Sequence, residues 1–273
     1  MKFKLIFLLF NILIFLSFAL VIFMPVMMLG SGYAGSFWSS SWYLPRLLLL
    51  VVIGIDLYFL LYWRLFSLLE TGDWSLLKGY LEKKVLQQGS TRSLFVRSLL
   101  HAYFVTGNLS QVQQLEDLLR SKKPGLMKKF VLELGLPKLI RKDNQQLIKF
   151  FDEFREKKVP RRNWVRFIHA FASLMEKEHS EGREELLQLS NEVKDPLLKV
   201  LVIYTLDPFR NIDDQAFGRV DRIREEMLQA YGKNELLEKL EKTKDNIAII
   251  VMGPLIKDAI EWLYAQGGHD SEN

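Results

Sequence analysis

The 273-residue sequence contains no cysteine and only four histidines. The lack of cysteine fits a reducing compartment, although many exported bacterial proteins also lack it. His101, His169, His179 and His269 are scattered, and none has a Cys, His or carboxylate at a recurring ligand spacing. The phosphate-loop pattern G-x-x-x-x-G-K-S/T is missing as well. The sequence therefore predicts no metal site, no cofactor and no enzyme activity.

Two polar features of the C-terminal part have structural explanations. His169 lies among Trp164, Phe167 and Phe171, so we expect a buried, hydrogen-bonded histidine. Glu184 and its neighbour Glu185 are expected to be solvated residues of a helix start, because acidic side chains favour helix N-termini.

Charged residues are missing from residues 5–30, LIFLLFNILIFLSFALVIFMPVMMLG. About 20 consecutive apolar residues are enough to span the hydrocarbon core of a bilayer. Residues 47–66 form a second segment of this kind. We therefore predict a two-helix transmembrane anchor over residues 1–66, with a short external loop over residues 31–46.

A secretory signal peptide is the alternative for the first apolar segment, because Lys2 and Lys4 give it a basic start. Against this alternative, the apolar region is longer than the usual 7 to about 15 residues, and no clear small-x-small cleavage site ends it. Two retained transmembrane helices are the interpretation we favour.

The positions of Lys and Arg predict the orientation of the anchor. Lys2 and Lys4 precede the first segment, Arg64 and Lys78 follow the second, and the loop carries no charge before Arg46. Basic residues favour the cytoplasmic side. The N-terminus and the C-terminal domain are therefore predicted to be cytoplasmic, at the plasma membrane or at the inner membrane of a bacterium.

The net charge gives little support for a nucleic-acid partner. The whole chain has a formal charge of +5, but residues 67–273 hold 33 of the 37 basic and 31 of the 32 acidic residues, which leaves +2. Nucleic-acid-binding domains carry a much stronger basic footprint. No nucleic-acid partner is predicted.

A near-repeat marks turns along the C-terminal part, with TGDWS at 71–75 and TGNLS at 106–110. Gly next to Asp or Asn is a turn signal, because Gly tolerates positive φ and Asx side chains cap the next helix. Further steps of about 35 residues reach polar breaks near 143, 178, 212 and 245, and apolar residues recur at three and four between them.

This pattern predicts an all-α fold. Two transmembrane helices are followed by an α-solenoid of helix-turn-helix repeats with a period of about 35 residues. We place the repeat domain at residues 67–267 and a disordered tail at residues 268–273.

Leu99, Tyr103, Gly107 and Pro124 are spaced like the leucine, the aromatic residue, the turn glycine and the boundary proline of a known repeat. In these residues the chain resembles the tetratricopeptide repeat family, over roughly residues 67–265. The resemblance implies scaffolding or peptide binding rather than catalysis. One departure from the family is Pro137, which is predicted to break a helix. Other helical-hairpin arrays remain alternatives.

Asp56 lies in the middle of the second predicted span, where an ionised carboxylate costs several kcal/mol unless it is paired or protonated. Antiparallel pairing of the two spans puts Ser17 roughly opposite Asp56, so we predict a polar contact between them. We interpret this contact as one of helix pairing or assembly, and a proton or ion relay is the alternative.

Basic residues gather at the predicted ends of the second helices of three hairpins. Cations suit helix C-termini, at about 0.3 to 1 kcal/mol each, but the charges continue past the predicted break. We therefore predict a basic rim that faces anionic membrane lipids, at roughly 1 kcal/mol per residue. The rim consists of Lys83, Lys84, Arg120, Lys122, Lys123, Lys157, Lys158, Arg161 and Arg162.

The predicted function is that of a membrane-anchored scaffold or adaptor, which presents a cytoplasmic tetratricopeptide-like solenoid to a protein partner. One alternative is an ion-coupled or assembly subunit of a membrane complex, working through its transmembrane helices and Asp56. The other is a membrane-bound, peptide-binding assembly factor.

Overall fold

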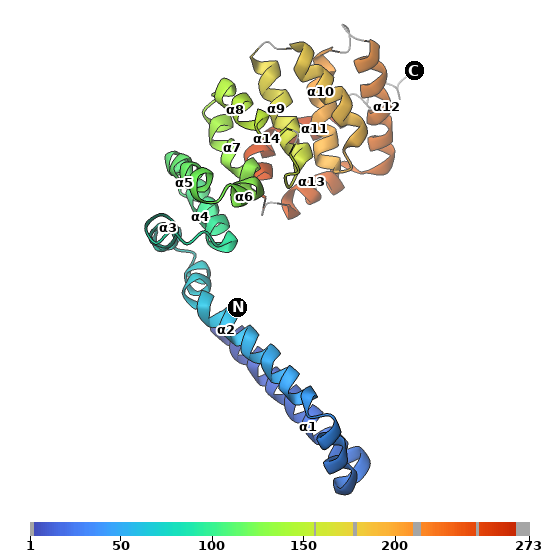
Figure 1. Ribbon diagram of the computed structural model, residues 1–273. Helices are drawn as coiled ribbons and strands as arrows, with labels where there is room; N and C mark the ends of the chain where they lie inside the picture. The colour runs from blue at the N-terminus through green and yellow to red at the C-terminus, as the bar shows by residue number, and fades with distance from the viewer. Residues whose placement is uncertain (1–2, 156, 177–178, 210–213, 244–245, 266–273) are drawn as a thin grey trace. The chain divides into compact units, whose positions relative to one another are not determined.

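The computed structural model describes residues 3–155, 157–176, 179–209, 214–243 and 246–265 (Figure 1). These residues form helices and turns without a strand, which confirms the predicted all-α class. The chain divides into two compact units, Met1–Tyr80 and Leu81–Asn273. The predicted tail at 268–273 lies outside the described residues.

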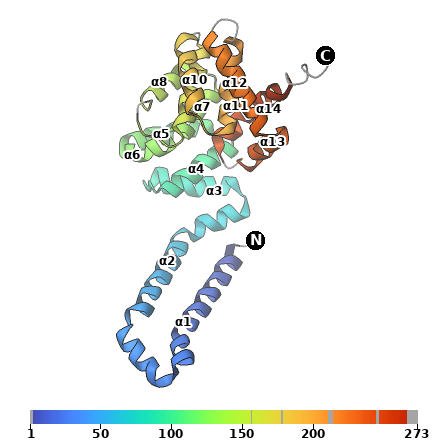
Figure 2. The same ribbon diagram turned by 90° about the vertical axis from the view of Figure 1, so that its right-hand side faces the viewer.

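Two long helices, α1 (Phe3–Ser40) and α2 (Tyr43–Thr71), make up most of the first unit. They run antiparallel (Figure 2), and the Phe7 ring packs edge-on against Phe59 and Trp63, with centroids 5.5 and 5.6 Å apart. Gly30, with a positive φ of 78°, kinks α1. The first unit is therefore a helical hairpin.

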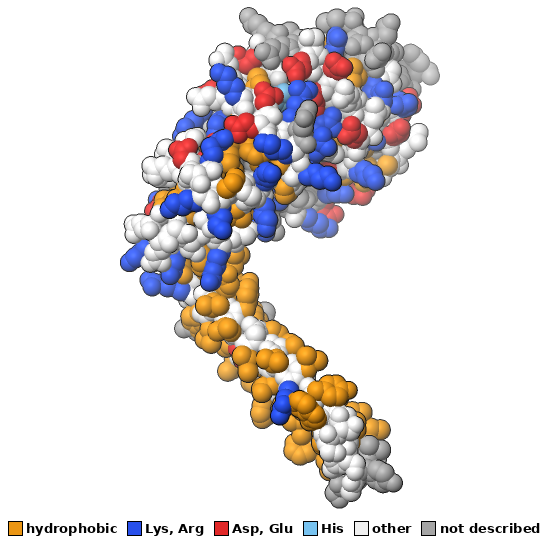
Figure 3. Space-filling model, viewed as in Figure 1, with side chains coloured by type: hydrophobic (Ala, Val, Ile, Leu, Met, Phe, Trp, Pro, Cys, Tyr) orange, Lys and Arg blue, Asp and Glu red, His pale blue; other side chains and the backbone are white. Residues whose placement is uncertain are grey.

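Both helices of this hairpin are long and apolar enough to cross a membrane. The segments are Leu5–Met28, with a mean hydropathy of 3.0, and Tyr43–Thr71, with 2.2. No residue is buried within the protein in the most apolar 18 residues of either segment, and hydrophobic side chains cover much of the hairpin surface (Figure 3). Exposed apolar patches of this extent mark membrane or protein contacts, and the core helix of a soluble domain would be buried instead.

The segment predicted as a short external loop, residues 31–46, is largely helical. α1 continues to Ser40, and only Ser41 and Trp42 separate it from α2. The Ser41 amide donates to the Phe37 carbonyl at 2.8 Å. Helical hydrogen bonding thus satisfies the backbone groups of this segment internally.

α2 continues without a break through Phe66 to Thr71, and Gly72 ends it with a left-handed φ of 67°. The predicted domain boundary after residue 66 therefore lies inside a helix, and the division between the units follows Tyr80 instead. The Arg64 guanidinium lies 5.2 Å from the centre of the Tyr80 ring. This contact joins the later part of α3 (Trp74–Glu82) to α2.

The second unit is a series of helical hairpins joined by short turns. Neighbouring helices pack against each other from α7 to α12, and α13 packs against α14. After α3, the described elements are η1 (Lys83–Gln87), α4 (Ser93–Val105), α5 (Leu109–Lys122), α6 (Pro124–Met127), η2 (Lys128–Phe130), α7 (Val131–Ile140), α8 (Asn144–Asp152), α9 (Arg162–Met175), α10 (His179–Glu192), α11 (Pro196–Leu206), η3 (Asp207–Phe209), α12 (Asp214–Ala230), α13 (Lys233–Lys242) and α14 (Ile247–Ala265).

Three of these hairpins follow the predicted spacing. Their first helices, α4, α7 and α9, end at Val105, Ile140 and Met175, which are 35 residues apart. Left-handed residues, Gly107 with φ 69° and Lys142 with φ 58°, form the first two turns. The predicted breaks near 178, 212 and 245 lie wholly or partly outside the described residues, so the period of the whole domain stays a prediction.

Pro137 lies inside α7, so the predicted helix break is wrong. A proline removes one hydrogen bond, here to the Glu133 carbonyl. The helix continues because tertiary packing holds it: Leu134 and Leu136 are fully buried, and α7 packs against α8 and α14.

α14 makes the second unit differ from an open solenoid, in which each repeat contacts only its neighbours. This helix packs against α13 and also against α11 and α7, which belong to earlier hairpins (Figure 1). Met252, Ile256 and Ile260 on α14 are buried. The last helix therefore fills the space that an open solenoid would leave between its hairpins.

Candidate functional site

Asp56 lies on α2, and its Oδ1 is buried without a hydrogen-bond partner among the described residues. The structure does not form the predicted contact with Ser17, whose Oγ donates to the Leu13 carbonyl at 2.9 Å. The Ser17 hydroxyl therefore donates its proton within its own helix and not to Asp56. This corrects the predicted pairing of Asp56 with Ser17.

The register of the hairpin explains the difference. Phe10 packs against Phe59, with ring centroids 6.1 Å apart. In an antiparallel pair, seven residues forward from Phe10 to Ser17 correspond to seven residues back from Phe59, which reaches Val52. Ser17 therefore lies about one helical turn from the level of Asp56.

The nine residues of the predicted basic rim all lie in the second unit, and their contacts divide them into two groups. Arg120 forms ion pairs with Glu153 at 2.7 Å and with Glu116 at 3.2 Å. Arg161 forms an ion pair with Glu133 at 2.9 Å. These two arginines are bound to carboxylates, which reduces their availability for lipid.

The other rim residues form no ion pair with a described residue. Lys157 also contacts an aromatic ring, because its Nζ lies 5.0 Å from the centre of the Phe154 ring. Lys128 and Lys129, which sequence reasoning missed, are also exposed, and Lys and Arg side chains gather over the α4–α6 region in Figure 3. The unpaired members are Lys83, Lys84, Lys122, Lys123, Lys157, Lys158 and Arg162.

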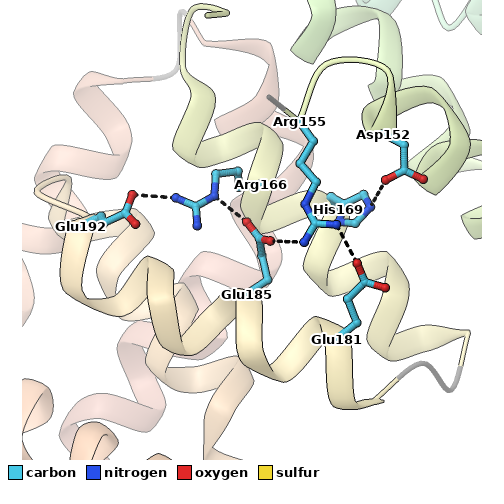
Figure 4. A network of polar contacts seen from close by, with 7 residues as sticks. All are labelled: Asp152, Arg155, Arg166, His169, Glu181, Glu185 and Glu192. Atoms are coloured by element: carbon cyan, nitrogen blue, oxygen red, sulfur yellow. Dashed lines mark hydrogen bonds and ion pairs between the residues drawn. The ribbon is translucent and has the colours of Figure 1, made fainter. Parts of the chain in front are cut away.

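An ionic network around two buried residues, Arg166 and Glu185, joins α9, α10 and the turn after α8 (Figure 4). Glu185 accepts hydrogen bonds from Arg155 at 2.8 Å and from Arg166 at 2.5 Å. Arg155 also binds Glu181, and Arg166 also binds Glu192, each at 2.6 Å. The expectation that Glu185 is solvated is therefore wrong.

Two opposing effects act on the Glu185 carboxyl. Burial by itself would raise its pKa, but hydrogen bonds and charges from Arg166 and Arg155 outweigh burial and hold the pKa below its usual range. The carboxylate therefore stays ionised, and the network has the character of a structural clamp between helices.

His169 is buried and its Nε2 lies 3.0 Å from Asp152 Oδ1, which confirms the expected hydrogen-bonded core histidine. Within the described parts of the chain, no three His, Asp or Glu side chains form a group that suits a metal ion.

Three exposed apolar side chains occupy the same position in three hairpins. Val105, Ile140 and Met175 are the last residues of α4, α7 and α9, and 49%, 42% and 56% of each is exposed. Single exposed apolar residues are common on protein surfaces. Their equal spacing distinguishes these three, which we call the turn row. Sequence reasoning missed the row because each residue simply continues the apolar pattern of its helix.

Comparison with known proteins places the second unit in a family. A family model described as "Uncharacterised Treponema protein" matches residues 111–265. A protein of Treponema pallidum (strain Nichols), described as "Uncharacterized protein", is 24% identical over 213 residues, which cover 74% of this chain and 68% of the relative. No solved structure matches the chain. The family region extends from α5 to the end of α14.

Proposed function

This chain belongs to the family described as "Uncharacterised Treponema protein", and we propose that it is a membrane-anchored scaffold or adaptor. In this proposal α1 and α2 hold the chain in a bilayer, and the second unit presents its helical hairpins to a protein partner. The hairpins do so without catalysing a reaction, as in the tetratricopeptide-like arrays that the sequence resembles.

The observation that carries the proposal is the exposed apolar surface of the first unit. Two helices with mean hydropathies of 3.0 and 2.2 leave their most apolar 18-residue stretches unburied. In water such a surface is costly, at roughly 25 cal/mol per Å², and a bilayer removes that cost. The distribution of Lys and Arg supports a cytoplasmic N-terminus and a cytoplasmic second unit.

The turn row supports a protein partner for the second unit. Protein contact surfaces are built around apolar side chains that lose water on binding. Val105, Ile140 and Met175 offer such side chains at regular intervals along the hairpins.

A photo-crosslinking amino acid at Ile140 or at Met175 tests this proposal in native membranes. Gln188 and Gln229, which are exposed polar residues of α10 and α12, are the matched control positions. The proposal expects the same protein to be crosslinked from both row positions and from neither control. Equal capture at all four positions, or no capture from the row, would contradict it.

A second candidate is an assembly subunit that works through its transmembrane helices. It is favoured by the buried Oδ1 of Asp56, which has no hydrogen-bond partner in the described part of the chain, since polar groups inside membrane spans are costly and are used for pairing or transport. An Asp56→Asn variant separates the two roles. Loss of a co-purifying membrane partner indicates an assembly contact, whereas intact assembly with loss of an ion-dependent activity indicates a relay.

A further inference from the structure

The ends of two second helices and the segment after η1 meet at one edge of the second unit. Arg120 at the end of α5 pairs with Glu153 at the end of α8 at 2.7 Å. On the other side of α5, Lys122 Nζ lies 3.9 Å from the position that a Cβ on Gly89 would take. These contacts join the three hairpin ends into a continuous edge.

Along this edge the arginines are paired with acids and the lysines are not. Glu153 is bound by Arg120, and Glu181 is bound by Arg155. Four lysines stand beside these pairs, exposed and without an ion pair to any residue described. They are Lys122, Lys123, Lys157 and Lys158, which we call the lysine edge.

Helix capping accounts for Lys122, in the last turn of α5, but not for the other three lysines. The helix dipole favours cations only within the last turn. α5 ends at Lys122 and α8 ends at Asp152, so Lys123, Lys157 and Lys158 lie beyond the helices. An ammonium group is a compact, strongly hydrated point charge on a flexible stem, which suits phosphate groups at a wet surface.

We propose that the lysine edge binds the phosphate headgroups of anionic phospholipids, in the same bilayer that holds α1 and α2. This inference rests on the proposed membrane anchoring. Each lysine near an anionic surface contributes about 1 kcal/mol, which corresponds to roughly a fivefold change in affinity. Such weak contacts suffice for a tethered domain, because the tether keeps its effective concentration at the membrane high.

The test uses the full chain in vesicles, with a single fluorophore on Ser121→Cys beside the lysine edge. The natural chain has no cysteine, so this label is unique. Lipids with a nitroxide on the headgroup quench a fluorophore that lies at the bilayer surface. Gln229→Cys, an exposed residue near the end of α12, is the control label. The vesicles contain phosphatidylcholine alone or phosphatidylcholine with phosphatidylglycerol.

We expect quenching at Ser121→Cys to rise with phosphatidylglycerol content and to fall in about 1 M salt, where the Debye length is only about 3 Å. Reversing Lys122, Lys123 and Lys158 to Glu should abolish this rise. Reversing Lys194, Lys233 and Lys257 to Glu, which are exposed elsewhere on the second unit, changes the charge equally and should leave it intact. Helix content by circular dichroism confirms that both variants fold.

Quenching that ignores lipid charge, or that falls equally in both triple variants, overturns the inference. The inference is also overturned if added RNA, but not vesicles, protects the thiol of Ser121→Cys from reaction with the fluorophore. Alkaline extraction of the vesicles tests the anchor separately. A chain that resists extraction but shows no lipid-dependent quenching contradicts this inference alone, whereas a chain that is extracted contradicts the proposed function as well.

Discussion

Arg166 on α9 and Glu185 on α10 form an ion pair at 2.5 Å, with only 9% and 5% of their side chains exposed. The pair lies at the centre of the network that clamps α9, α10 and the turn after α8. Because both groups are buried, each charge depends on the other. Their coupling gives the second unit a feature that can be tested without knowing its partner.

Replacing Glu185 by Gln should lower the free energy of unfolding of the second unit by about 3 kcal/mol, because the buried charge of Arg166 then keeps only the exposed Glu192 as an acidic partner. Chemical denaturation of the chain in micelles measures the loss. Glu238→Gln is the matched control, since Glu238 pairs with Lys242 at the surface, with 64% and 72% exposed. Surface pairs contribute little, and an equal effect of the two substitutions would refute the clamp.

The same carboxylate predicts a pH dependence. Because the pKa of Glu185 is lowered in the folded state, its contribution is complete above the unfolded value of about 4.3 and is lost as the pH falls through the lower, folded value. As the pH is lowered from about 6 to 3, the thermal unfolding temperature should therefore fall more steeply for the natural chain than for Glu185→Gln. Parallel pH profiles of the two proteins would contradict this prediction.

The crossing of α7 and α8 depends on Gly135, because a Cβ there would lie 2.4 Å from Cζ of Phe151. Gly135→Ala should destabilise the second unit by about 1 to 3 kcal/mol through overpacking. Gly253→Ala on α14 is the control, as its Cβ would meet no atom within 4 Å, and it should stabilise the helix by up to about 1 kcal/mol. The denaturant midpoints of both variants are compared with that of the natural chain. If both midpoints shift in the same direction, the prediction is contradicted.

The packing of α14 against α7 predicts coupling between hairpins that are far apart in sequence. Ile256 is fully buried on α14, and Ile256→Ala should cost about 2 to 5 kcal/mol. Hydrogen exchange should then accelerate in α7 as well as in α13 and α14. In an open solenoid, the change would stay within the last hairpin and its neighbour.

The features that sequence reasoning found are those with local signals. Gly107 and Asp143 mark turns because positive φ and Asx capping are properties of single residues. The length of the two apolar segments is equally local. Sequence reasoning failed where contacts with residues distant in sequence determine the local structure. Pro137 stays in a helix because of tertiary packing. Residues 31–40 are helical, although their sequence suggests a loop.

The candidate sites were predictable only in part, for the same reason. The basic rim is visible as a series of Lys and Arg, but the pairing of Arg120 with Glu153 spans 33 positions and has no sequence signature. The offset of Ser17 from Asp56 is a matter of one helical turn, which depends on how the aromatic rings interlock. The closure by α14 follows from contacts across more than 100 residues, which a repeat pattern does not reveal.

The central claim is that α1 and α2 hold the chain in a membrane with the second unit on the cytoplasmic side. The absence of cysteine allows a direct measurement. Ser40→Cys, at the end of α1, and Gln114→Cys, exposed on α5, are labelled in intact bacterial spheroplasts with a membrane-impermeant maleimide, and the mass of the labelled chain is determined. The account predicts that Ser40→Cys reacts from outside, that Gln114→Cys reacts only after permeabilisation, and that the N-terminal segment is retained. Labelling of Gln114→Cys from outside, or a mass that lacks the first apolar segment, would contradict it.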